Sequence, residues 1–115
     1  MEGVLQKLIN YKKTVIFMDK LREMQLLLAK IPKRKVSTYG LLAKKLKIHP
    51  RYAGKLLSRN TDGIKYPCFK IICSDGSLGG FTSKHGLKDK IKRLKADGIE
   101  IKNNKIDLKK YCYYF

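Results

Sequence analysis

The stretch YGLLAKKLKIHPRYAGKLLSR, residues 39–59, decides the fold. Its first half spaces apolar side chains along one helical face, at Leu41, Leu42, Ala43 and Leu46. Ile48-His49-Pro50 is a tight break, and Pro50 suits the first position of a second helix that runs from Arg51 to Arg59. Two short helices joined by a brief turn, the second opening with arginine, predict a helix-turn-helix over residues 39–59.

Three further segments flank this motif. Upstream, Asp19 is a plausible N-cap for a helix that Pro32 ends, and residues 1–18 form a short basic lead-in with a partial helix and a short extended piece. Downstream, residues 64–72 are expected to be an extended strand. Residues 87–97 are expected to form a last helix, which Gly98 ends.

The end of the chain alternates apolar and polar residues around Asn103-Asn104, which is a hairpin signal, and closes with aromatic residues. We therefore expect a hairpin and a docked aromatic tail over residues 98–115. The fold class is α/β, mostly α, with a winged helix-turn-helix-like core, a short strand and a C-terminal β-hairpin. Residues 19–115 are expected to form one domain.

Charge is the strongest compositional signal. The chain has 27 Lys plus Arg against 9 Asp plus Glu, a formal net charge of +18 over 115 residues. That balance favours a polyanionic partner, with nucleic acid first, an anionic membrane second and a merely solvated lysine coat as the plain alternative. No apolar stretch approaches the roughly 20 residues that span a bilayer. We expect an intracellular monomer with reduced thiols.

Cys68 is the candidate reactive residue. It lies in the sequence Pro67-Cys68-Phe69-Lys70, among apolar residues and beside a cation that favours a thiolate. The plain alternative is a buried packing cysteine. Cys73 and Cys112 have no comparable context, and the three cysteines lack the spacing of a zinc site.

A series of short motifs resembles the DNA-binding domain of O6-alkylguanine-DNA alkyltransferases over about residues 20–98. In order, the matching motifs are Ile31-Pro32-Lys33, Lys35-Val36, Thr38-Tyr39-Gly40, Pro50-Arg51, Ala53-Gly54, Asn60, Pro67-Cys68 and the run from Ser74 to Phe81. The end of the chain, from Lys88-Asp89-Lys90 through Asp97-Gly98 to Tyr111, resembles instead the alkyltransferase-like proteins, short relatives that bind alkylated DNA but lack the reactive cysteine.

The resemblance implies that Cys68 accepts an alkyl group from guanine O6 and is consumed, with no metal or diffusible cofactor. In the family a histidine follows the cysteine and accepts its proton through a water, held by a glutamate. Here Phe69 replaces the histidine and Asp97 stands where the glutamate would be. Because phenylalanine cannot accept a proton, Lys70 and Lys90 are the cations that would favour the thiolate.

The resemblance also implies contacts with duplex DNA containing O6-alkylguanine. Tyr39 would rotate the phosphate of the target nucleotide, Arg51 would fill the gap left by the flipped base, and Asn60 would brace the turn before the active-site strand. The second helix would lie in the minor groove, where Ala53 and Gly54 are small but Tyr52 and Lys55 add bulk. The residues expected to line the guanine pocket are Leu57, Phe69, Ile71, Phe81 and Thr82.

The leading hypothesis is repair by alkyl transfer to Cys68. The alternative is a non-catalytic sensor that flips the damaged base and recruits another repair pathway; Phe69 and the sensor-like tail favour it, whereas Cys68 favours the enzyme. A sequence-specific transcription factor is a poorer hypothesis, because the second helix is not rich in base-reading side chains.

Overall fold

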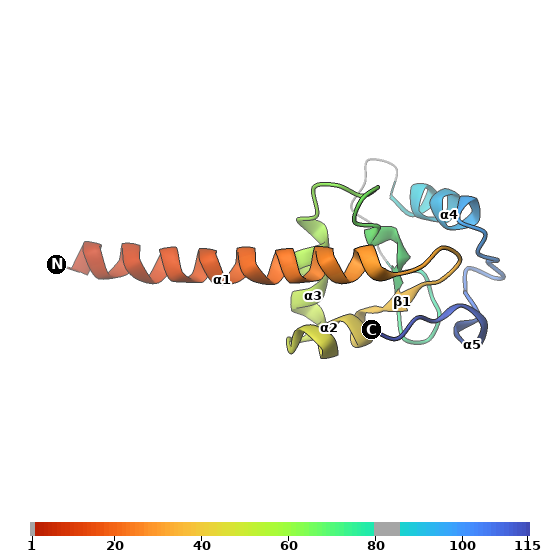
Figure 1. The fold of residues 1–115 in the computed structure, drawn as a ribbon, viewed down its shortest axis with the longest axis horizontal. Helices are drawn as coiled ribbons and strands as arrows, with labels where there is room; N and C mark the ends of the chain where they lie inside the picture. Colours follow the sequence, from red (N-terminus) through yellow and green to blue (C-terminus); the bar gives the residue numbers. More distant parts are fainter. Residues whose placement is uncertain (1, 80–85) are drawn as a thin grey trace.

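A single long helix, α1 (Glu2–Lys30), dominates the shape of the molecule. The computed structural model describes residues 2–79 and 86–115. Its extents are 58 × 28 × 22 Å, and Figure 1 shows that the N-terminal half of α1 projects away from the shorter elements while its C-terminal half packs on them. The chain therefore consists of a domain and a protruding helical arm, which is the N-terminal half of α1, up to about residue 18.

The expected helix start at Asp19, with an extended piece before it, was wrong. Asp19 lies inside α1, and no proline interrupts the helix from residue 2 to residue 30. The Thr14 hydroxyl donates a hydrogen bond to the backbone oxygen of Asn10 at 2.9 Å, which accommodates this β-branched residue within the helix. β-Branched residues lower helix propensity by only a fraction of a kcal/mol each, and they do not end a helix whose neighbours favour it.

The helix-turn-helix is confirmed. It consists of α2 (Tyr39–Leu46) and α3 (Pro50–Ser58), with Pro50 in the first turn of α3 as expected. The Thr38 hydroxyl caps α2 by accepting a hydrogen bond from the Leu41 amide at 3.1 Å. The His49 Nδ1 atom caps α3 by accepting one from the Arg51 amide at 3.1 Å. These caps fix the directions of the two helices.

The expected strand over residues 64–72 is mostly absent. Only β2 (Ile71–Ile72) is extended, and it pairs in parallel with β1 (Ser37–Thr38), Ser37 opposite Ile71. Before it lies the 3₁₀ helix η1 (Cys68–Lys70). The Asp62 carboxylate accepts hydrogen bonds from the amides of Ile64 and Lys65, and this side chain-to-backbone turn competes with an extended chain.

The C-terminal segment forms a turn and a helix in place of a hairpin. After α4 (Leu87–Ala96), Lys102 and Lys105 exchange backbone hydrogen bonds across Asn103-Asn104, both with positive φ, so the expected turn forms. The strands do not continue, because Asp107 caps the short helix α5 (Leu108–Tyr111). The docking of the tail is confirmed: Val36 exchanges backbone hydrogen bonds with Tyr111 and Tyr113, at 2.8 and 2.6 Å.

Two buried clusters meet at the small sheet. The first lies between the C-terminal half of α1, α2 and α3, and includes Ile71; the second lies under α4 and the tail, and includes Ile72. Successive residues of a strand face opposite sides, so β2 contributes one isoleucine to each cluster. The chain just before β2 is thereby held between the helix-turn-helix and α4. No helix in the described part of the chain is long and apolar enough to cross a membrane.

Candidate nucleic-acid interface and reactive cysteine

Cys68 is half-buried at the start of η1, and its side chain packs against the first cluster. Its amide donates a hydrogen bond to the Tyr66 oxygen at 2.8 Å. The Asn60 side chain donates to the same oxygen at 2.7 Å, and its own oxygen accepts from Gln25 of α1 at 3.3 Å. Asn60 thus ties the segment that leads into Cys68 both to the end of α3 and to α1.

Tyr39, Cys73, Gly79 and Lys90 lie close to one another beside Cys68. The Lys90 ammonium is 6.0 Å from the centre of the Tyr39 ring. Gly79 has a φ of +70°, and a methyl group added there would lie 3.2 Å from both Cys73 Sγ and the Tyr39 ring. The backbone therefore approaches these side chains closely at Gly79, where both the conformation and the space favour glycine.

Lys90 is a buried cation in this group. Its side chain is 1% exposed and donates a hydrogen bond to the Ile71 oxygen at 2.7 Å. Burial lowers the pKa of Lys90 from 10.5 to about 8, and negative charge on Cys73 and Cys68 acts in the opposite direction. Burial also raises the pKa of Tyr39, as does negative charge on the same two thiols. One ammonium is therefore placed to interact electrostatically with both thiols.

Lys70, the other cation expected to act on Cys68, is engaged elsewhere. Its ammonium forms an ion pair with Asp97 at 2.9 Å and donates a hydrogen bond to the Pro32 oxygen at 3.0 Å. The Asp97 carboxylate also accepts a hydrogen bond from the Arg34 amide at 2.9 Å. Asp97 therefore joins η1, the end of α4 and the turn after α1. Its two partners are the Lys70 ammonium and the Arg34 amide, and neither is a base.

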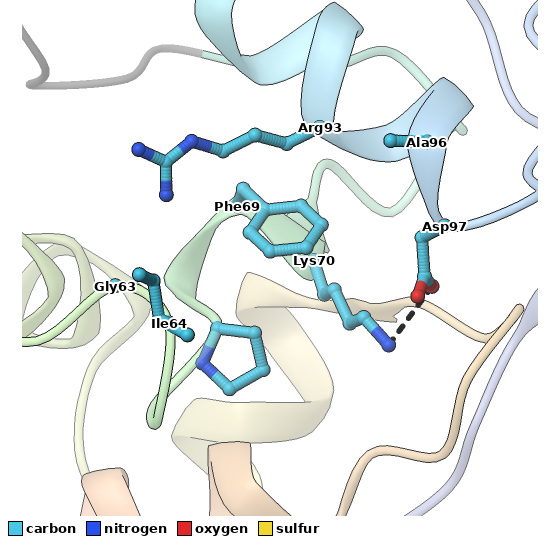
Figure 2. A pocket seen from close by; sticks show the side chains of 8 residues that line it. Gly63, Ile64, Phe69, Lys70, Arg93, Ala96 and Asp97 are labelled. Carbon is cyan, nitrogen blue, oxygen red and sulfur yellow. Dashed lines mark ion pairs between the residues drawn. The ribbon is translucent and has the colours of Figure 1, made fainter.

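Phe69 faces a different side of the molecule from Cys68. It packs against the second cluster and lines an open cavity of about 510 Å³ between η1 and α4. Figure 2 shows its ring between the side chains of Arg93 and Lys70, with Asp97 beyond Lys70. The structure therefore does not bring Phe69 together with Leu57 and Ile71, which belong to the first cluster.

The exposed side of α3 carries Arg51 and Gly54. Arg51 is exposed, and a methyl group added at Gly54 would meet nothing within 4 Å. The assignment of Ala53 as a DNA contact is corrected, because its side chain is completely buried in the first cluster. Of the two small residues, only Gly54 faces outward and permits close approach to a groove.

Tyr52 and Lys55, which add bulk to α3, contact the arm. The Tyr52 ring makes an edge-to-face contact with Phe17 of α1 at 6.0 Å between ring centres, and the Lys55 ammonium lies 5.9 Å from the centre of the Phe17 ring. With Lys13 and Thr14 they line a surface cavity of about 490 Å³. Their bulk therefore lies partly against α1, which the sequence pattern did not reveal.

The expected pocket residues are only partly placed. Leu57 and Ile71 lie in the core, 9% and 0% exposed, so they would support the wall of a pocket without forming much of its surface. Phe81 and Thr82 lie outside the described residues. Cys73 was missed as a residue close to Tyr39 and Lys90; its position directly after β2 and five residues after Cys68 was the signal that could have identified it. No group of three or more potential metal ligands occurs within residues 2–79 and 86–115.

Comparison with known proteins relates this geometry to a family. Residues 21–99 match the family described as 6-O-methylguanine DNA methyltransferase, DNA binding domain. A bifunctional methyltransferase/endonuclease of Picrophilus torridus is 52% identical over 89 residues, covering 76% of this chain and 29% of the relative. A DNA base-flipping protein of Vibrio parahaemolyticus is 41% identical over 85 residues, covering 70% of this chain and 82% of the relative.

A solved structure has the same fold. The structure of S. pombe Atl1 in complex with damaged DNA containing O6-carboxymethylguanine superposes with a TM-score of 0.74 at 23% identity, covering 84% of this chain and 96% of that chain. The chain spans less than half of the length of the Picrophilus relative and of a methylated-DNA–protein-cysteine methyltransferase of Candida glabrata, 29% and 45%. The match over residues 21–99 shows that the chain belongs to the family of 6-O-methylguanine DNA methyltransferase DNA-binding domains.

Proposed function

We propose that this protein repairs O6-alkylguanine in duplex DNA by transferring the alkyl group to Cys68. The Cys68 thiolate attacks the alkyl carbon, an S–C bond forms and the C–O6 bond breaks. The electron pair of that bond stays on the guanine, which takes up one proton, equivalent to the one that the Cys68 thiol lost, and becomes ordinary guanine within the DNA, while the thioether remains on the protein. The step consumes one thiol per lesion and uses neither metal nor cofactor.

The observation that carries this proposal is the buried Lys90 ammonium, which interacts electrostatically with Cys73 and, less strongly, with Cys68. A thiol without a neighbouring histidine needs another group that favours the thiolate, and a nearby cation in a poorly solvated site does so. Lys70 is already paired with Asp97, which leaves Lys90 as the described lysine whose charge is coupled to the thiol.

The surface of α3 supports docking to DNA. The net charge of +18 supplies an electrostatic attraction to the phosphates, Gly54 leaves room for close approach, and Arg51 is exposed at the first turn. The alkyl carbon is out of reach inside the base stack, so the target guanine must leave the helix. Arg51 would fill the space that it leaves, and Tyr39 at the start of α2 would turn its phosphate.

The alternative function is a sensor that binds the flipped lesion without reacting. Phe69 favours it, because the position that holds the proton acceptor in the family holds a hydrocarbon ring that points toward Arg93. Asp97 favours it as well, because its carboxylate is paired with the Lys70 ammonium and bonded to the Arg34 amide. The two functions share the docking surface and differ only in what Cys68 does.

The deciding experiment is intact-mass spectrometry after incubation with a duplex that carries one O6-methylguanine. A gain of one methyl group, located on Cys68 by peptide mapping and lost in Cys68→Ser, is the expected result. Cys73→Ser is the matched control, because this second thiol is coupled to the same ammonium; it should still gain the methyl group. No mass gain, combined with tighter binding to the damaged duplex than to the normal one, would establish the sensor.

A further inference from the structure

The arm exposes a large set of apolar side chains. Between residues 4 and 18 of α1, each of eight large apolar side chains is at least 37% exposed: Val4, Leu5, Leu8, Ile9, Tyr11, Val15, Ile16 and Met18. Figure 1 shows this part of α1 standing clear of the rest of the molecule. Isolated helices of this length are marginal in water, and a bare apolar face makes an unpartnered arm less favourable still.

These side chains lie on the opposite side of α1 from the face that packs on the domain. At 100° per residue, the eight side chains fill an arc of roughly 180° that only Lys12 interrupts. Phe17, Leu21, Met24 and Leu28, which pack in the first cluster, fill an arc centred roughly 170° away. The exposed face is therefore a second apolar surface that the domain itself cannot cover.

One half of that face has the spacing of a coiled-coil seam. Val4, Leu8, Tyr11, Val15 and Met18 alternate steps of four and three residues, and Arg22 ends the pattern at the next position. Such a spacing keeps one stripe facing one partner helix along its whole length. The stripe fits a single straight helix as its partner better than an irregular surface.

We propose that α1 pairs with α1 of a second copy of this chain, in antiparallel orientation, to form a two-fold dimer. In one register four of the five seam residues meet one another: Val4 lies opposite Val15 of the second copy, and Leu8 lies opposite Tyr11. The contact is the same for both copies, so it closes at two chains. The sequence alone suggested a monomer, because the exposed face becomes apparent only when residues 4–18 are helical.

Charge distinguishes the antiparallel from the parallel pairing. Leu5, Lys7, Lys12 and Thr14 flank the seam. In the antiparallel register, Lys12 lies opposite Leu5 of the second copy, and Lys7 lies opposite Thr14. A parallel pairing would bring Lys7 beside Lys12 on both sides of the seam and would place the strongly basic domains of two chains, each of net charge +18, next to each other. The antiparallel pairing holds the two domains roughly 40 Å apart along the shared helix axis.

The available surface is sufficient. The exposed fractions of the five seam residues and of Leu5 beside them correspond to roughly 700 Å² for each copy, close to what each partner buries in an interface of standard size. A dimer that is populated at micromolar concentration is consistent with that area.

The first test is sedimentation equilibrium of the full chain from about 1 to 100 μM, in roughly 0.5 M salt, where repulsion between the basic domains is screened. The wild type should dimerise, and Leu8→Glu, at the centre of the seam, should be monomeric with an unchanged helical circular dichroism spectrum. Gln6→Glu is the matched control: it adds the same charge to the opposite face and should remain dimeric. A monomeric wild type, a dimer that survives Leu8→Glu, or a monomer that binds anionic phosphatidylglycerol vesicles instead would overturn the proposal.

The second test determines the orientation. Under mild oxidation, a mixture of Val4→Cys and Val15→Cys chains should form a disulfide between the new cysteines, located by peptide mapping. Val4→Cys alone should not, because residues 4 of the two copies lie roughly 16 Å apart along the axis, too far for a disulfide. A disulfide between two Val4→Cys chains would show a parallel dimer and overturn the register. Neither test involves DNA or Cys68, so their outcome is independent of the proposed repair function.

Discussion

The Lys70 ammonium lies 2.9 Å from the Asp97 carboxylate, and only 5% and 15% of the two side chains are exposed. This pair joins η1 to the end of α4, and the backbone groups of Pro32 and Arg34 complete its hydrogen bonds. The acid that the family resemblance assigns to a proton relay is thus part of a buried ion pair. Its removal should affect folding before it affects chemistry.

Asp97→Asn should therefore destabilise the protein by about 3–5 kcal/mol, because it leaves the Lys70 charge buried without its counter-ion. Thermal unfolding followed by calorimetry measures the loss. Lys70→Met combined with Asp97→Asn should be more stable than Asp97→Asn alone, since no unpaired charge remains. Glu23→Gln is the control; it breaks the more exposed Lys20–Glu23 pair and should cost less than about 1 kcal/mol. If Asp97→Asn leaves stability unchanged but abolishes methyl transfer, a relay role is supported instead.

A second prediction concerns the dependence of stability on pH. The pKa of Lys90 is about 8 in the folded protein, lowered mainly by burial, against 10.5 for an ordinary lysine. Between these values the unfolded chain binds more protons than the folded chain, so the free energy of unfolding rises with pH. The cost of burying the ammonium is fully present below pH 8 and is relieved as the pH rises toward 10.5.

From pH 8 to pH 10, the free energy of unfolding of the wild type should therefore rise relative to that of Lys90→Met. Urea unfolding of both proteins at each pH measures this difference. Lys92→Met replaces an exposed lysine of the same helix and should give a difference that does not vary with pH. A pH-independent difference for Lys90→Met would mean that Lys90 titrates normally. The same variant should react more slowly with iodoacetamide at Cys68, because the cation that favours the thiolate is gone.

The parts of this structure that the sequence predicted are those with strong local signals. Pro50 and the apolar spacing of α2 and α3 locate the helix-turn-helix within a residue or two. The strand before Ile71 was mispredicted because the Asp62 side chain organises a local turn, and β1, which runs parallel to β2, does not extend before Ser37 to pair with that segment.

The partners of the site residues depend on tertiary contacts that spacing does not encode. Lys70 and Lys90 are both lysines near Cys68 in the sequence-based interpretation, yet one is paired with Asp97 and the other is buried beside the thiols. Ala53 and Gly54 are adjacent small residues, but neighbouring positions of a helix point in different directions. Ala53 is therefore buried, whereas a methyl group at Gly54 would face open space. The arm was missed because α1 has apolar residues on one side in its N-terminal half and on the opposite side in its C-terminal half. Over the whole helix these two contributions largely cancel, so no single apolar face stands out in the sequence.

A third prediction tests Arg51 as the residue that replaces the flipped base. Arg51→Ala should weaken binding to a duplex with O6-methylguanine by roughly 1–3 kcal/mol, the range of one stacking contact, and should weaken binding to the undamaged duplex less. Arg59→Ala is the matched control, because it removes the same charge from the other end of the same helix. It should lower both affinities equally through its phosphate attraction. Equal losses for Arg51→Ala on the two duplexes, measured by fluorescence anisotropy, would argue against insertion.

The last prediction separates stability from DNA binding at Gly54. This glycine lies inside α3, and an added methyl group would contact nothing within 4 Å, so Gly54→Ala should raise the free energy of unfolding by up to about 1 kcal/mol. If α3 enters a groove, the same methyl group should lower the affinity for duplex DNA several-fold, because it prevents the closest approach of the helix to the DNA. Gly3→Ala is the control: it fills equally open space in the arm, should stabilise the protein slightly, and should leave DNA affinity unchanged. A Gly54→Ala protein that is more stable and binds DNA as tightly as the wild type would show that α3 docks on the backbone rather than in the groove.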